Sequence, residues 1–96
     1  MKTLLLTAAL LSFTVSAKDN MSDNEFCETV SETAEAVMQN RQAGSDMADL
    51  YKITKTKMSR LMVVEAYKIP QYSTEKYRKR EVMAFKNSWF RSCITR

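Results

Sequence analysis

The chain has almost no residues that turn a polypeptide sharply. Its 96 residues include one glycine, Gly44, and one proline, Pro70. Sheets and loop-rich folds depend on such residues at their turns, whereas a helix needs few of them. Because apolar residues also recur at spacings of three and four positions, the sequence predicts an all-α fold, a small helical bundle.

Two long helices are expected, over residues 23–43 and 74–93. The first has Ser22 and Glu25 at capping-box spacing and stops at Gly44, a residue typical of the position after a helix. Its apolar stripe consists of Phe26, Cys27, Val30, Ala34, Val37 and Met38. The last helix has Ser73 or Thr74 as its N-cap. Its inward stripe consists of Val82, Phe85, Trp89 and Cys93.

Two shorter helices are expected between the long ones. Ser45 or Asp46 caps the first of them. Its expected inward side chains are Met47, Leu50, Tyr51 and Ile53. The polar residues 54–57 then interrupt the apolar pattern. A second apolar stretch follows over residues 58–67 and stops at Ile69-Pro70, because a residue before proline disfavours the α region.

The first seventeen residues have the pattern of a secretory signal peptide. Lys2 gives a positive start, residues 4–15 form a short apolar run, and Val15-Ser16-Ala17 forms the cleavage signature. An apolar run of about a dozen residues is too short to span the hydrocarbon core of a bilayer. We therefore expect cleavage near Ala17, a single helical domain over residues 18–96, and a periplasmic or secreted location.

The expected domain contains two cysteines, Cys27 and Cys93, one near each end. In an exported chain, an even number of cysteines favours a disulfide, although two free thiols or a bridge between chains remain open. A bridge within the chain requires Cα atoms within about 7 Å of each other. Three long helices would leave these cysteines at opposite ends of the bundle. The bridge therefore predicts antiparallel outer helices and a reversal at residues 54–57; one straight helix over 46–69 would exclude it.

The charges of the expected domain are divided between its two halves. Residues 18–50 carry eight acids and two bases, a net charge of −6, and residues 51–96 carry three acids and twelve bases, a net charge of +9. Two interpretations remain open. The acidic first helix lies along the basic last helix and compensates it, or the basic half forms a surface for an anionic partner such as a membrane. No nucleic-acid-binding motif accompanies the basic residues, so we do not expect nucleic acid as a partner.

The sequence offers no catalytic pattern. It has no histidine and no CxxC motif, which excludes the common nucleophile pairs, most zinc sites and dithiol redox chemistry. The helical spacing of Glu28, Glu32 and Glu35 places them on an exposed face, as solvated side chains rather than as catalytic acids. The methionines are spread along the chain and are expected to fill the core rather than bind copper. We therefore expect no enzyme activity, no metal and no cofactor.

Three features are candidates for binding. Tyr72 lies in the turn after Pro70 and is the candidate exposed aromatic residue of a loop. The start of the last helix is basic, which suits lipid phosphates, glycans or an acidic protein, or else internal pairing with the acidic helix; its residues are Lys76, Arg78, Lys79 and Arg80. Trp89 and Phe90 are adjacent and cannot both face the core, so Phe90 is expected to be partly exposed unless a neighbouring helix covers it.

Four segments resemble a group of small exported helical proteins of proteobacteria and their prophages. They are Phe26-Cys27, Val37-Met38-x-x-Arg41-Gln42-x-Gly44, Ala66-Tyr67-x-x-Pro70-x-Tyr72-Ser73-Thr74-Glu75 and Phe85-x-x-x-Trp89-Phe90-x-x-Cys93. The resemblance covers most of the chain after the leader. It implies a periplasmic location and a prophage origin. It implies no catalytic residue, because no activity is assigned to the group.

These observations lead to two hypotheses on function. The first is a non-enzymatic periplasmic binding protein that acts by contact with an unidentified envelope protein. Such a protein would interfere, for example, with the penetration of a superinfecting phage or with lysis. The second is a periplasmic chaperone-like stress protein that exposes apolar surface when its N-terminal acids are protonated.

Overall fold

The computed structural model describes residues 22–96 and contains four helices in this range. They are α2 (Asp23–Ala43), α3 (Met47–Ile53), α4 (Lys57–Ala66) and α5 (Glu75–Ile94). The predicted all-α fold, with two long helices and two short ones between them, is confirmed. The predicted signal peptide and its cleavage site near Ala17 lie outside the described residues.

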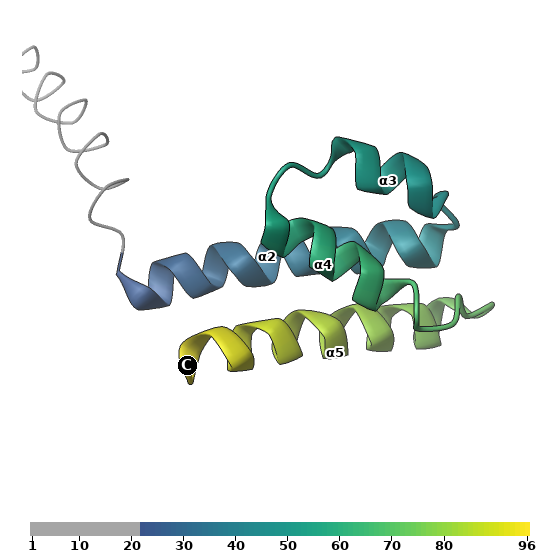
Figure 1. Ribbon diagram of the computed structural model, residues 1–96. Helices are drawn as coiled ribbons and strands as arrows, with labels where there is room; N and C mark the ends of the chain where they lie inside the picture. Colours follow the sequence, from purple (N-terminus) through teal and green to yellow (C-terminus); the bar gives the residue numbers. More distant parts are fainter. Residues whose placement is uncertain (1–21) are drawn as a thin grey trace, which may run out of the picture.

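The two long helices, α2 and α5, lie side by side and antiparallel, so that the start of α2 is next to the end of α5 (Figure 1). Cys27 and Cys93 form a disulfide there, with their Cα atoms 5.6 Å apart. The bridge requires an even number of helices, so that the first and the last are antiparallel. The break between α3 and α4 divides the middle segment into two helices and so gives this even number. The predicted topology is therefore confirmed, together with the pairing of the cysteines within one chain.

Local sequence signals fix the helix ends. The Ser22 hydroxyl accepts the N–H of Glu25 while the Glu25 carboxylate accepts the N–H of Ser22, which completes the predicted capping box. Gly44 has φ 93°, in the left-handed region that glycine enters without strain. Asp46, rather than Ser45, caps α3, and Thr74, rather than Ser73, caps α5.

The α4 helix differs from its predicted range at both ends. It starts at Lys57, because Thr56 and Ser59 form a second capping box, and this places Lys57 in the helix rather than in the break. It ends at Ala66, three residues before Ile69. Residues 67–69 form a turn instead, in which the N–H of Ile69 donates to the carbonyl of Ala66.

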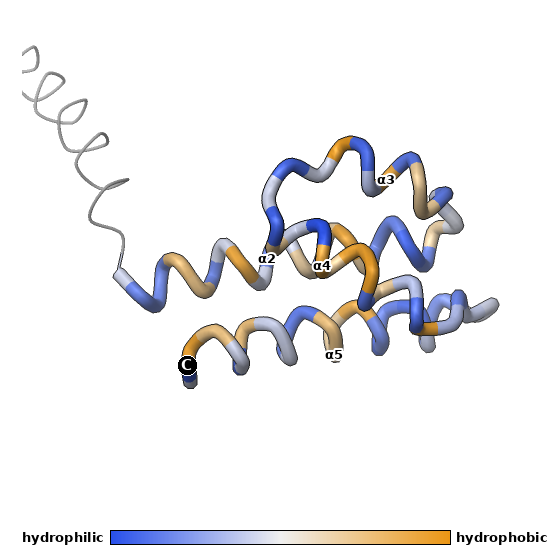
Figure 2. The backbone as a smooth tube through the Cα atoms, viewed as in Figure 1, coloured by the Kyte–Doolittle hydropathy of each residue, from blue (hydrophilic) through white to orange (hydrophobic). Residues whose placement is uncertain are grey.

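One core connects α2, α4 and α5, with a single contribution from α3. Among the described residues, the buried apolar residues of this core run from Cys27 to Cys93, the two residues that the disulfide joins. Figure 2 shows that the most continuous hydrophobic stretch lies in α4, where Met62, Val63 and Ala66 are almost fully buried. On α5, Val82, Phe85 and Cys93 are buried, as the predicted stripe requires.

The prediction for α3 is wrong in three of four positions. Leu50 is buried, but Met47, Tyr51 and Ile53 are exposed. The reason is that α3 packs on α4 and has no extensive contact with either long helix, so one residue of this short helix is enough to fill the contact. Phe26 also departs from its predicted place in the core, because it lies in the first turn of α2, at the edge of the bundle, and is 38% exposed.

Across residues 22–96, no helix has the length and the apolar character that a membrane crossing requires.

Candidate binding surfaces

The turn after Pro70 is held against the end of α2. The Arg41 Nε donates to the carbonyl of Ile69 at 2.9 Å. The Gln42 amide nitrogen donates to the carbonyl of Pro70 at 2.9 Å, and its oxygen accepts the N–H of Tyr72 at 2.8 Å. Two side chains of α2 therefore satisfy the backbone of the turn.

Tyr72 is consequently not the exposed loop aromatic that the sequence predicts. It is half-buried, its ring lies 6.2 Å from the ring of Tyr77, and its carbonyl accepts a hydrogen bond from Arg78 Nε at 2.6 Å. Tyr72 thus joins the turn to the start of α5. Because the turn is occupied by contacts within the chain, it offers no free recognition loop.

The four predicted basic residues of α5 do not form one patch. Arg78 is half-buried against the turn, and Arg80 lies over the ring of Tyr77, with 5.3 Å between its guanidinium carbon and the ring centroid. Lys79 pairs with Glu75 of its own helix at 3.6 Å, and Lys76 is exposed. Within the described part of the chain, none of the four forms a salt bridge with α2.

The pairing between the acidic and basic helices occurs one to two turns further along α5. Lys86 Nζ lies 3.1 Å from Glu35 Oε1, and both side chains are 30% exposed. This is the one salt bridge between α2 and α5 among residues 22–96. Of the two interpretations of the basic start of α5, internal pairing with α2 by salt bridges is therefore not found at these four residues.

A hollow of about 440 Å³ lies between α2 and α5, away from the disulfide. Arg78 and Lys79 line it together with Glu35, Glu75 and the apolar side chains of Val82 and Met83. The cations therefore face carboxylates across the same hollow. This mixed charge gives no preference for an anionic or a cationic ligand.

A more apolar groove lies at the disulfide end. Two hollows of about 290 and 180 Å³ share the walls Phe26, Val30 and Met58. The first continues along α4 to Met62, and the second continues along α5 to Trp89. We call this surface, formed by Phe26, Val30, Met58, Met62 and Trp89, the Phe26 groove. Hydroxyl groups of Thr29, Thr33, Thr56 and Ser59 line its first part.

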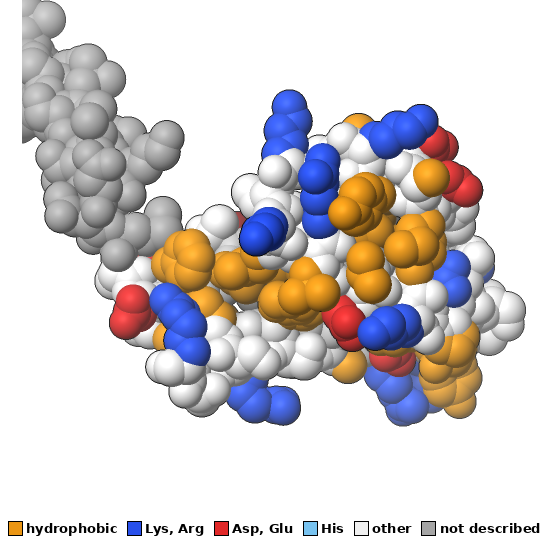
Figure 3. All heavy atoms as spheres, in the orientation of Figure 1, with side chains coloured by type: hydrophobic (Ala, Val, Ile, Leu, Met, Phe, Trp, Pro, Cys, Tyr) orange, Lys and Arg blue, Asp and Glu red, His pale blue; other side chains and the backbone are white. Residues whose placement is uncertain are grey.

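Exposed apolar side chains surround the Phe26 groove. Figure 3 shows them in a band that runs from the start of α2 across α4 to α3. Phe26 is 38% exposed and Met58 is 39% exposed. Apolar surface of this kind, gathered on one face, marks interaction sites more often than single scattered residues do.

Arg96 closes the end of the groove. Its guanidinium carbon lies 5.3 Å from the centroid of the Phe26 ring. Its Nη1 donates to the carbonyl of Cys93 at 2.6 Å and lies 2.9 Å from the sulfur of the same residue. Arg96 therefore holds the Phe26 ring beside the disulfide and places a positive charge at the rim.

Trp89 and Phe90 are both half-buried and pack against the core. Phe90 therefore has the partial exposure that the sequence predicts, and Trp89 shares it. Trp89, rather than Phe90, lines the groove. Phe26 and Met58 could not be recognised as groove residues from the sequence. Periodicity indicates the helix face on which a residue lies, but not whether another helix covers that part of the face.

The titratable groups give little indication of chemistry. Residues 22–96 contain no cluster of three His, Cys, Asp or Glu side chains that could hold a metal. Burial raises the pKa of Tyr67, which Arg41 partly offsets and Asp46 reinforces. The hydroxyl of Tyr67 donates to the carbonyl of Ser45, so this tyrosine fastens the end of α4 to the α2–α3 turn.

No protein-family model, no curated protein and no solved structure matches the chain.

Proposed function

We propose that the chain is a non-enzymatic binding protein of the bacterial periplasm that contacts an envelope protein through the Phe26 groove. The observation that carries this proposal is the pair of adjoining apolar hollows that share Phe26, Val30 and Met58 at the disulfide end. An apolar groove between helices is the surface on which an amphipathic helix of a partner docks.

The groove is well suited to a rigid contact. The Cys27–Cys93 disulfide holds the ends of α2 and α5 together directly beside it, so the separation of these two walls is fixed covalently. A preformed site loses less conformational entropy on binding than a mobile one. The threonine and serine hydroxyls along its first part can form hydrogen bonds to polar groups at the border of a bound helix.

The proposal includes a periplasmic location and a role in phage entry or lysis. The leader pattern of residues 1–17 and the disulfide support export, because disulfides persist in oxidising compartments. The resemblance to small exported prophage proteins supports interference with a superinfecting phage or with lysis. Both processes involve envelope proteins.

Site-specific photo-crosslinking in cells tests the proposal. A photoreactive amino acid replaces Thr29, which lines the groove, and the matched control carries it at Asn87, an exposed position of α5 that does not line the groove. We expect a discrete adduct with an envelope protein from position 29 and none from position 87. The same adduct should disappear in the Phe26→Ser variant.

Adducts of equal yield from both positions would indicate random collisions and would contradict the proposal. The absence of any adduct from position 29 in oxidised, folded protein would also contradict it. Circular dichroism of each purified variant verifies that the helices are retained.

A further inference from the structure

The segment that joins α3 to α4 is strongly cationic. Residues 51–64 contain four bases and no acid, and all four bases are exposed: Lys52, Lys55, Lys57 and Arg60. Lys52, Lys55 and Lys57 form no salt bridge with any carboxylate of residues 22–96. The positive charge of this segment is therefore available to an external anion.

Exposed apolar side chains accompany these cations. Ile53 ends α3 and is 70% exposed, the highest exposure among the large apolar residues of the described chain. Leu61 is 50% exposed and Tyr51 is 40% exposed. We call the surface formed by Tyr51, Lys52, Ile53, Lys55, Lys57 and Leu61 the hairpin surface.

Arg60 fixes the shape of this segment. Its Nε donates to the carbonyl of Thr54 at 3.0 Å, and its guanidinium carbon lies 5.0 Å from the centroid of the Tyr51 ring. The capping box of Thr56 and Ser59 holds the start of α4 directly after the link. The segment that follows Ile53 is consequently held in a defined turn by these hydrogen bonds.

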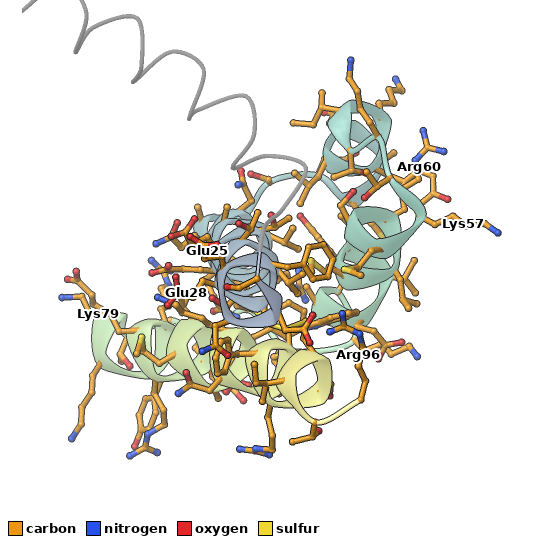
Figure 4. All side chains as sticks on the ribbon, turned by 90° about the vertical axis from the view of Figure 1, so that its left-hand side faces the viewer. Glu25, Glu28, Lys57, Arg60, Lys79 and Arg96 are labelled. Atoms are coloured by element: carbon orange, nitrogen blue, oxygen red, sulfur yellow. A yellow bond between two sulfur atoms is a disulfide. The ribbon has the colours of Figure 1, made fainter. Side chains whose placement is uncertain are left out.

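The cations of the α3–α4 segment and the acids at the start of α2 lie on opposite sides of the molecule. In Figure 4, Lys57 and Arg60 point away from the bundle on one side, whereas Glu25 and Glu28 lie on the other side of α2. When the hairpin surface faces an anionic layer, the acidic face of α2 is therefore turned away from it. This arrangement orients the molecule as well as attracting it.

We propose that the hairpin surface binds an anionic phospholipid bilayer, with Ile53 inserted among the lipids and Lys52, Lys55 and Lys57 at the phosphates. Apolar side chains combined with cations form the contact of proteins that lie on a membrane without spanning it. Residues 51–55 line none of the three hollows described above, so no cavity there receives a side chain of a partner protein. A lipid layer needs no such cavity, which favours lipid over an acidic protein.

This inference goes beyond the proposed function and does not depend on it, because the two surfaces have no residue in common. A protein that binds lipid through its hairpin surface and no partner through its groove would support this inference alone. The opposite result would support the proposed function alone.

Vesicle co-sedimentation tests the inference. The oxidised domain of residues 18–96, which contains every core residue described above, is mixed with vesicles of phosphatidylglycerol and phosphatidylcholine, or of phosphatidylcholine only. We expect binding to the anionic vesicles that weakens as salt is added. The triple variant Lys52→Gln, Lys55→Gln, Lys57→Gln should bind about a hundredfold more weakly, at about fivefold for each cation removed. Ile53→Ser should weaken binding about tenfold.

Two matched controls distinguish binding through the hairpin surface from non-specific attraction of a basic protein to anionic vesicles. The triple variant Lys76→Gln, Lys79→Gln, Arg91→Gln removes three exposed charges from α5, and Met83→Ser removes an apolar side chain that is 50% exposed. Both should bind nearly as well as the unmodified protein. An equal loss in the two triple variants would overturn the inference, as would the absence of binding to anionic vesicles at low salt.

A soluble polyglutamate peptide tests the competing class of partner. Binding of this peptide, lost in the hairpin triple variant and accompanied by no vesicle binding, would replace lipid with an acidic protein and would overturn the inference. Vesicle binding without measurable peptide binding is the expected result.

Discussion

The side-chain oxygen of Gln42 accepts the backbone N–H of Tyr72 at 2.8 Å, which ties the end of α2 to the turn before α5. Gln42 is 2% exposed, and its amide nitrogen also donates to the carbonyl of Pro70. A buried polar side chain normally destabilises a small core unless its hydrogen bonds are satisfied. Here one side chain satisfies two backbone groups of the turn. Gln42 therefore holds the turn against α2 by hydrogen bonds rather than by apolar packing.

Replacing Gln42 with alanine should lower the free energy of unfolding by about 2 kcal/mol, because the groups of Pro70 and Tyr72 lose their partner. Urea denaturation of the oxidised protein measures this difference. Gln39→Ala, an exposed substitution one turn earlier on α2, is the control and should change stability little. Equal stabilities of the two variants would contradict the role assigned to Gln42.

The disulfide should contribute more to stability than any single side chain. It joins residues 66 positions apart, and on the chain-entropy model a loop of this size stabilises the fold by about 4 kcal/mol. The double variant Cys27→Ser, Cys93→Ser should therefore unfold at a much lower urea concentration. Addition of a reductant should lower the midpoint of the unmodified protein and leave that of the double variant unchanged; a double variant as stable as the oxidised protein would refute this estimate.

Alkaline pH should destabilise the fold through Tyr67. Burial raises its pKa in the folded state above the ordinary value of about 10, so above that pH the unfolded chain releases the proton more readily than the folded one. This contribution to stability is complete below pH 10 and is lost as the pH rises through the folded pKa. Unfolding curves at a series of pH values measure the effect.

Tyr67→Phe is the matched variant for this test. It should cost about 1 kcal/mol at neutral pH through loss of the hydrogen bond to Ser45. The difference in stability between the two proteins should then diminish above pH 10. A difference that stays constant with pH would show that Tyr67 does not contribute to the alkaline transition.

The Glu35–Lys86 pair should have a small effect that depends on salt. Its side chains are partly solvated, and pairs of this kind contribute at most about 1 kcal/mol. Lys86→Glu should destabilise the protein at low ionic strength, and the exchange variant Glu35→Lys, Lys86→Glu should recover most of the loss. Failure of the exchange to recover any stability would indicate that Lys86 acts through its packing rather than through its charge.

The order of the four helices and most of their ends could be predicted from the sequence. The capping box of Ser22 and Glu25, the positive φ of Gly44 and the break after Ile53 each follow from a local preference of a few residues. The disulfide then selected one topology. Three long helices would place the two cysteines at opposite ends of the bundle, farther apart than a bridge allows. These rules involve neighbours in the chain or one covalent restraint, so a single sequence contains enough information to apply them.

The surfaces could be predicted much less well. Tyr72 was expected to be exposed, but Gln42 holds its backbone N–H and the side chain is half-buried. Ile53 was expected to face the core, but no helix reaches it. In each case the outcome depends on which element packs against that position. Helical periodicity contains no information on the lengths over which two helices overlap.

The central claim is that the protein acts by contact through the Phe26 groove, and quantitative capture of its partner tests that claim most directly. The oxidised protein is immobilised beside two double variants of equal chemical change: Phe26→Ser with Met58→Ser in the groove, and Tyr77→Ser with Met83→Ser on exposed parts of α5. The account predicts that a specific envelope protein is retained by the unmodified protein and by the α5 variant. The groove variant should bind it at least about tenfold more weakly. Equal retention by the groove and α5 variants would contradict the account.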